Sequence, residues 1–327
     1  LDAWLARDGV KLTALLTGAL AVHNAVAARV AAPPVLTPRD EPAETISRTR
    51  LLWLALRRKP LGAVSAGIIL LLVLTAIFAG VLAPYDPLVA RPDIPPQPPS
   101  REHLFGTDDI GRDVLSRIIH GSRISLWVGL LAVSIGTAVG MLVGLVCGYW
   151  EGRIDLLLQR LMDAVQAIPG LILALAIVSV LTPNTTNAMI AIALVIIPGN
   201  SRIVRGAVLS PKQNRYVEAA EALGCRHLHI LARHILPNVT APILIIASIW
   251  LGNAILIEAT LSFLGLGTQP PIPSWGLMLS STGRAFMEQA PWLAIFPGLA
   301  ISLAVLAFNL FGDTLRDAWD PKLRRKG

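Results

Sequence analysis

The chain has 327 residues, of which 54% are hydrophobic and 15% are charged, and it carries a formal net charge of +7. Its mean hydropathy of +0.62 is too high for a soluble domain of this length, and its charges are clustered. These values exclude an ordinary soluble enzyme and predict an all-α protein that crosses the membrane several times. Topology and anionic lipid explain the positive charge, so we expect no nucleic-acid partner.

Residues 1–46 are expected to form an N-terminal extension of unknown role. The charge-free part between Lys11 and Arg29 has only 17 residues and is weakly hydrophobic, so it could lie on the membrane surface or form a marginal seventh span. A cleaved signal peptide fits less well. Residues 47–60 follow as a cytoplasmic lead-in.

Five uncharged apolar runs follow, at 61–85, 124–150, 164–201, 234–257 and 289–312. A bilayer core of about 30 Å needs about 20 helical residues, so the third run must fold back, and Pro183-Asn184 is the expected turn. We therefore predict a domain at 61–313 and a cytoplasmic tail at 314–327. Its six spans are expected at about 61–83, 124–149, 160–182, 186–203, 240–265 and 292–312.

Basic residues are divided unequally between the two sides of the predicted membrane. One side holds those of 48–59, 153–160, 202–233 and 316–326. The other side holds only Arg91, Arg101, Arg112, Arg117, Arg123 and Arg284. Because short loops rich in Lys and Arg stay in the cytoplasm, we expect the N-terminal side of the first span and the C-terminus to be cytoplasmic.

The loop at 84–123 is expected to be extracytoplasmic. It is proline-rich and extended through Pro99, and a cluster of capping residues at 106–109 then predicts a helix. Apolar residues share one face of that helix, namely Ile110, Val114, Leu115, Ile118 and Ile119. The opposite face carries Arg112, Asp113 and Arg117, which together with Asp108 are expected to face a partner protein. A helix that merely rests on lipid headgroups is the alternative.

Glycines recur every four residues in the second predicted span, at Gly136, Gly140, Gly144 and Gly148. They form one helical stripe, and close backbone approach through small residues is the usual association mode of helices in lipid. The stripe predicts a helix contact, either within this chain or with another chain.

A polar segment at 205–238 interrupts the apolar runs. Ser210 and Pro211 indicate the start of a short helix, because serine caps amides and proline fits the first turn. Gly224 is expected to end that helix in the left-handed conformation, and Pro237 is expected to end a second helix. Such an element cannot span lipid.

This segment has an unusually small face, formed by Ala219, Ala220 and Ala222. The groove of another protein could approach the backbone closely there. We therefore predict a docking element, with a hairpin that merely links two spans as the alternative.

Other polar residues carry weaker signals. Glu258 interrupts an apolar run, and an intramembrane carboxylate costs roughly 2.5 to 3.5 kcal/mol, so it has either a pathway or gating role or a structural hydrogen bond between helices. Asp163 and Asp313 lie near predicted span ends and are expected to be structural. Packed or solvated roles, rather than zinc binding or a disulfide, are expected for the remaining candidates, His227, His229, His234, Cys147 and Cys225.

Glu218, Ala219, Ala220, Gly224, Leu236 and Pro237 have the spacing of the EAA signature of ABC-importer permeases, which this segment resembles. Residues 47–325 are similar more broadly to the C-type permease of the dipeptide/oligopeptide/nickel ABC-importer family, in which His at position 234 is ordinary. The stretches that carry this resemblance are Arg48–Leu52, Ala83–Pro87, Gly106–Asp108, Gly111–Arg117, His234–Asn238, Leu261–Gly267, Pro273–Gly276 and Gly312–Asp317.

The resemblance implies a type I ABC importer permease fold with six spans and cytoplasmic coupling helices, in a bacterial cell membrane. It also implies a second, B-type permease, two cytoplasmic ATPase subunits or domains, and an extracytoplasmic binding protein that delivers dipeptides or oligopeptides. By this analogy Glu218 makes polar contacts with the ATPase, Ala219 and Ala220 allow a close fit, and Gly224 orients the two helices. Relatives that carry nickel, glutathione or haem keep those solutes open as alternatives.

ATP and Mg²⁺ are expected on partner subunits, because the chain has no Gly-Lys pair and hence no P-loop. We expect no cofactor, no metal and no catalytic residue in this chain. A secondary transporter using Glu258 would show inverted repeats or several intramembrane charges, and a membrane enzyme would show a catalytic cluster. The sequence shows neither pattern.

Overall fold

The computed structural model describes residues 60–93, 95–280 and 289–319. The chain divides into two units, Leu1–Ile46 and Ser47–Gly327, and every described residue belongs to the second. The expected N-terminal extension, the lead-in up to residue 59 and residues 320–327 of the tail lie outside the described residues. Within the described ranges the chain is helical, and its only β-type pairing is an isolated bridge between Thr107 and Asp113.

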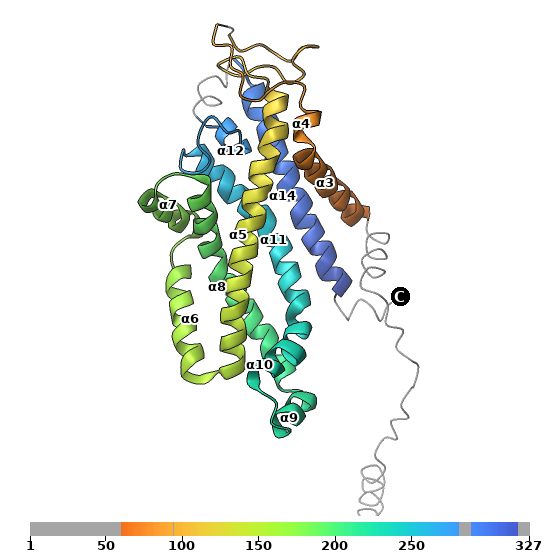
Figure 1. Cartoon of the computed structure of the whole chain (residues 1–327), viewed down its shortest axis with the longest axis vertical. Coiled ribbons are helices and arrows are strands. Elements are labelled where there is room, and N and C mark those ends of the chain that lie inside the picture. Colours follow the sequence, from red (N-terminus) through yellow and green to blue (C-terminus); the bar gives the residue numbers. More distant parts are fainter. Residues whose placement is uncertain (1–59, 94, 281–288, 320–327) are drawn as a thin grey trace, which may run out of the picture. The chain divides into compact units, whose positions relative to one another are not determined.

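The helices pack into one bundle, and the polar segment at 205–238 lies at one end (Figure 1). In chain order they are α3 (Pro60–Ile77), α4 (Ala79–Leu82), α5 (Val114–Trp150), α6 (Gly152–Gln166), α7 (Gly170–Leu181), α8 (Thr185–Lys212), α9 (Arg215–Ala222), α10 (His227–Ile230), the π-helical turn η1 (Leu231–Ile235), α11 (Leu236–Phe263), α12 (Trp275–Met278) and α14 (Trp292–Trp319).

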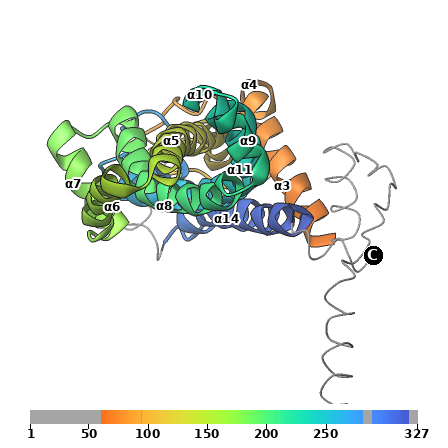
Figure 2. The same cartoon turned by 90° about the horizontal axis from the view of Figure 1, so that it is seen from below.

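Helices α5, α8 and α11 form the centre of the bundle, since each packs against the other two. Helices α6 and α7 lie against α8 on one flank, and α14 and α3 lie on the other (Figures 1 and 2). Helices α9 and α10 lie at the end of the bundle seen in Figure 2, which we call the α9 end. Helix α12 and the segment before α5 lie at the opposite end, the α12 end.

The glycine stripe of α5 faces α8 of the same chain. A Cβ atom on Gly140 would lie 2.7 Å from Cβ of Asn200, and one on Gly144 would lie 2.6 Å from the carbonyl oxygen of Ser201. Gly136 and Gly148 meet α8 in the same way. The stripe therefore joins two helices of this chain, which decides between the two alternatives left open by the sequence.

Among the described residues, five helices are long and apolar enough to cross a membrane, and the bent pair of α6 and α7 makes a sixth candidate span. The fold is therefore an all-α membrane bundle. The chain folds back as expected at Pro183-Asn184, where the Asn184 side chain caps α8 by accepting a 2.8 Å hydrogen bond from the Asn187 amide.

The third span is not the single straight helix expected at 160–182. Helices α6 and α7 meet at an angle of 86°. The break lies at Pro169, which precedes α7, because proline disfavours helical conformation in the residue before it and has no amide hydrogen to donate. Helix α6 begins at Gly152, before the start of the third span that the sequence predicts at about residue 160.

The separate surface helix expected from residues 107–119 is also not observed. Helix α5 begins at Val114 and continues without a break to Trp150. Asp113 caps it by accepting a 2.8 Å hydrogen bond from the Ser116 amide, and the residues before it form a tight turn in which Gly111 has a φ of +76°. The apolar residues of this region that are helical therefore belong to the second span.

Ser210 and Pro211 do not start the docking helix. Helix α8 continues through both to Lys212, and α9 begins after Asn214. The hydrogen-bonded helix of the fourth span extends into the polar segment because its amphipathic pattern continues, with Val204 and Val208 buried on one side.

Gly144→Val is expected to separate α5 from α8, because the added side chain would collide with the backbone of Ser201. Overpacking of this kind costs about 1 to 3 kcal/mol, which would appear as a lower melting temperature of the purified protein in detergent. Gly67→Ala on α3 is the matched control, since no atom lies within 4 Å of the Cβ it would add. Equal melting temperatures for the two variants would contradict the role of the stripe.

Candidate functional site

The segment at the α9 end contains the turn that the sequence predicts. Helix α9 ends at Ala222, and Gly224 follows in the left-handed conformation with a φ of +76°. The Gly224 amide donates to the Glu221 carbonyl at 2.9 Å, and the Cys225 amide donates to the Ala220 carbonyl at 3.1 Å. A residue with a β-carbon is disfavoured at this φ, so the expected role of Gly224 in the turn is confirmed.

An apolar cluster holds α9 to the bundle. Val217 and Ala220 are buried against residues of η1 and the ends of α5, α8 and α11. The rest of this cluster consists of Leu145, Tyr149, Val204, Val208, Ile230, Leu231, Ile235, Val239 and Ile243. Ala220 therefore fits against its own chain and does not present a small face outward, whereas Ala219 is exposed.

Polar contacts tie the same segment to the ends of α5 and α8. The Tyr149 hydroxyl donates to Glu221 Oε1 at 3.2 Å and lies 2.8 Å from Nδ1 of His227. Nearby, Nζ of Lys212 lies 2.8 Å from Oε1 of Glu151. Tyr149 thus ties the C-terminal end of α9 to the end of α5, and His227 has a packing role.

The histidines of this segment make aromatic contacts. The rings of His229 and His234 lie 6.0 Å apart, and Tyr216 contacts His234 at 6.1 Å. In the described ranges no three His, Cys, Asp or Glu side chains converge as a metal site. Cys147 is buried in α5 and Cys225 is half-buried beyond the turn, and both are free.

The outward surface of the segment combines carboxylates with exposed leucines. Leu223 is 84% exposed and Leu228 is 75% exposed, on either side of the Gly224 turn, and Glu218 and Ala219 are exposed beside them. The sequence motifs do not include either leucine. Two large apolar residues on either side of a glycine turn in a polar segment could have indicated an exposed apolar surface. We call Glu218, Ala219, Leu223 and Leu228 the α9 surface.

Pro237 does not end the second helix, contrary to expectation. Helix α10, the π-helical turn η1 and α11 form one continuous helical rod from His227 to Phe263. The π-helical turn just before Pro237 shifts the hydrogen-bond register, as shown by the Leu236 amide donating to the Leu231 carbonyl, and this accommodates the missing proline amide. Leu236 is half-buried and Pro237 is exposed.

Glu258 lies near the α12 end of that rod, only five residues before α11 ends at Phe263. Its carboxylate is 1% exposed. Oε1 accepts a hydrogen bond from Ser262 Oγ at 2.8 Å, and Oε2 accepts one from Ser125 Oγ of α5 at 3.2 Å. Of the two roles considered for Glu258, these contacts favour the structural hydrogen bond between helices.

The loop after α11 folds around Glu258. The Thr268 amide donates to Ser262 Oγ at 3.0 Å, and the Trp275 amide donates to Ser125 Oγ at 3.4 Å. Trp275 is buried and its indole donates to the Ile118 carbonyl at 3.0 Å. Leu261–Gly267 and Pro273–Gly276, two of the stretches that carry the family resemblance, therefore pack the loop after α11 against α5 at the α12 end.

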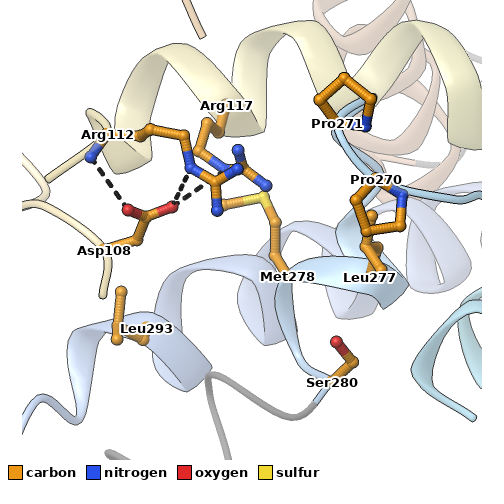
Figure 3. Close-up of a pocket in the computed structure, with 9 residues that line it drawn as sticks. All are labelled: Asp108, Arg112, Arg117, Pro270, Pro271, Leu277, Met278, Ser280 and Leu293. Carbon is orange, nitrogen blue, oxygen red and sulfur yellow. Dashed lines mark hydrogen bonds and ion pairs between the residues drawn. The ribbon is translucent and has the colours of Figure 1, made fainter. Parts of the chain in front are cut away.

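The four residues expected to face an extracytoplasmic partner instead pair with their own chain. Asp108 is 5% exposed and accepts a 2.6 Å hydrogen bond from Nε of Arg112, while Nε of Arg117 lies 3.5 Å away. Figure 3 shows both guanidinium groups turned toward that carboxylate. Asp113 caps α5 and lies 2.9 Å from the His103 ring. These four residues therefore stabilise the turn before α5 and do not form the outward face of a surface helix.

A small cavity of about 100 Å³ lies beside this cluster. Pro270, Pro271 and Met278 close it on the side of α12 (Figure 3). Because Asp108 and Asp109 together balance the charges of Arg112 and Arg117, the cavity offers no strong recognition of a charged solute.

Glu258→Gln is expected to keep stability and uptake close to those of the unmodified protein, since an amide oxygen still accepts from the surrounding hydroxyls. Glu258→Leu would leave the hydroxyls of Ser125 and Ser262 without their acceptor and should cost about 1 to 3 kcal/mol, measured by thermal unfolding in detergent. A Gln variant that is stable but has lost uptake would instead support a pathway role.

Family models and curated relatives both match this chain to membrane permease subunits of transport systems. Residues 140–325 match the family described as binding-protein-dependent transport system inner membrane component, and residues 47–99 match the N-terminal TM domain of oligopeptide transport permease C. The dipeptide transport system permease protein DppC of Alkalihalophilus pseudofirmus is 43% identical over 299 residues, which cover 90% of this chain and 98% of DppC. The glutathione transport system permease protein GsiD of Escherichia coli O157:H7 is 44% identical over 288 residues, covering 88% and 95%.

Among solved structures, an inward-facing chain of the MetNI methionine ABC transporter superposes with a TM-score of 0.52 at 16% identity. The superposition covers 63% of this chain and 98% of the MetNI chain. At this identity the likeness concerns the fold alone, which is that of a type I ABC importer permease.

Proposed function

Because this chain belongs to the family of binding-protein-dependent transport system inner membrane components, we propose that it is a permease subunit of an ATP-driven importer for short peptides. The observation that carries this proposal is the 43% identity to a dipeptide permease along nearly the whole of both chains. The chain itself is a multi-pass membrane subunit and has no P-loop with which to bind nucleotide.

Two kinds of solute are supported by the relatives named above. One relative carries a dipeptide and the other carries glutathione, which is itself a short peptide. Both solutes combine carboxylate and ammonium groups with amide bonds, so a short peptide is the shared chemistry. Nickel and haem lack that chemistry and remain the alternatives.

The partners follow from the absence of a nucleotide site and from the exposed surface at the α9 end. Two ATPase subunits or domains that bind ATP and Mg²⁺ would dock on the α9 surface, with the two leucines filling an apolar groove and Glu218 at its edge. A second, B-type permease would complete the path, and a binding protein would deliver the solute at the α12 end. In this arrangement the α9 end and the C-terminus are cytoplasmic, as the basic residues predict.

The geometry supports transmission of motion from the α9 surface. Helix α9 is held by the Val217 and Ala220 cluster and by Tyr149, so it cannot move independently of the ends of α5 and α8. The continuous rod from His227 to Phe263 then reaches the Glu258 contacts at the α12 end. When ATP closes the partner ATPases, displacement of α9 would tilt this rod and change access to the path between the two permeases.

Uptake by the complete transporter tests the proposed solute. This chain, its B-type partner, the ATPases and the binding protein would be reconstituted in proteoliposomes with ATP on the ATPase side. We expect ATP-dependent accumulation of a labelled dipeptide that unlabelled dipeptide inhibits. Accumulation of nickel or haem without accumulation of peptide would contradict the proposal.

The docking surface can be tested separately with Leu223→Glu. Placing a charge in the centre of an apolar contact is expected to weaken binding of the ATPases by about tenfold, measured as affinity for the detergent-solubilised permease pair. Gln213→Glu, which adds the same charge at an exposed position after α8, is the matched control. Unchanged affinity in the Leu223 variant would exclude the α9 surface as the docking site.

A further inference from the structure

Helix α6 has two chemically different faces. Asp155, Gln159 and Asp163 recur every four residues and so lie along one stripe, which faces α8. Ile154, Leu157 and Leu161 lie on the opposite side and are at least half exposed, as expected for a lipid-facing surface. The helix therefore separates lipid from a polar groove between itself and α8.

Two ion pairs cross that groove with different exposure. Asp155 accepts two hydrogen bonds of 2.6 Å from the guanidinium of Arg205 and is largely buried. Asp163 and Arg202 make one contact of 2.6 Å, and their side chains are 45% and 55% exposed. The buried Asp155–Arg205 pair joins α6 to α8 by two hydrogen bonds, whereas the half-exposed Asp163–Arg202 pair is accessible to a ligand.

The groove has a volume of about 390 Å³, within the range of about 300 to 1,000 Å³ that small-molecule sites occupy. Arg160 and Gln159 complete its polar lining. In the part of the chain that the structure describes, the buried Nε2 atom of Gln159 has no hydrogen-bond partner. This nitrogen is enclosed by protein beside the Cys147 thiol of α5, between the two ion pairs.

The open pair lies at the edge of the apolar runs, because Arg202 follows directly after the uncharged run 164–201. At this level α8 packs on Gly140 of α5, which lies inside the uncharged run 124–150. Charged groups at the edge of the hydrocarbon normally face water or a partner, because exposure to hydrocarbon costs several kcal/mol.

We propose that the groove between α6 and α8 lines the solute path of the assembled transporter and holds the charged ends of a short peptide. The inference rests on the proposed function. Asp163 complements the ammonium group of the solute, and Arg202 complements its carboxylate. The two charged residues pair with each other when no solute is present.

Cysteine labelling tests whether the groove contains water. Gln159→Cys and Leu157→Cys would each be made in a chain whose Cys147 and Cys225 are replaced by Ser, and the complete transporter would be treated in proteoliposomes with a hydrophilic maleimide. Only a thiol in water ionises readily, so position 159 is expected to react at least about tenfold faster than position 157. A dipeptide in excess should slow that reaction.

Charge removal tests contact with the solute. Arg202→Gln leaves Asp163 unpaired, so the ratio of KM values for a glutamate-containing and a lysine-containing dipeptide should rise by about twofold to fivefold. Binding of either peptide by the binding protein should not change. Arg153→Gln, at an exposed residue outside the groove, should leave the ratio unaltered.

The outcomes separate this inference from the proposed function. Equal labelling at positions 157 and 159 would show that the groove does not contain water and would overturn the inference. An unchanged KM ratio in the Arg202 variant would overturn the contact with solute charges. Absence of dipeptide uptake in the unmodified transporter would reject the peptide as solute, while labelling would still decide whether the groove lines a path.

Discussion

The close approach of α5 to α8 is the contact on which the rest of the structure depends. Four glycines bring the two backbones so near that a single β-carbon would collide with the facing helix. Lipid gives apolar side chains little reason to associate, and extended backbone contact supplies the packing that replaces the hydrophobic effect. Tyr149 lies at the end of α5 and contacts Glu221 of α9, and Lys212 lies at the end of α8 and pairs with Glu151. The same helix contact therefore determines where the polar segment at 205–238 lies.

Three buried carboxylates organise the opposite end of the bundle. Glu258 joins α11 to α5 and holds the loop that contains Trp275, while Asp108 and Asp113 hold the turn before α5. Each carboxylate is surrounded by hydroxyls, amides or guanidinium groups, which makes its burial tolerable in a region of low dielectric constant. The helical rod is thus anchored at one end by Glu258 and packs against α9 at the other.

The errors of sequence reasoning share one cause, which is that local patterns do not identify the neighbour of a side chain. Asp108, Arg112 and Arg117 were expected on a surface because they are charged, yet each finds a countercharge within its own loop or helix. Ala220 was expected to face a partner because it is small, yet it packs against its own bundle. Pro211 and Pro237 were expected to bound helices, but α8 and the π-helical turn accommodate them.

Hydropathy and the position of Gly224 were sufficient to predict from the sequence a helical bundle with up to six spans and a left-handed turn in its polar segment, because spans and left-handed turns depend on local composition and backbone sterics. The tertiary structure alone decided which helix the glycine stripe meets, that the third span bends by 86° at Pro169, and that Asp163 and Arg202 share a groove. Those features depend on which distant segments lie side by side, and that information arises only when the helices pack.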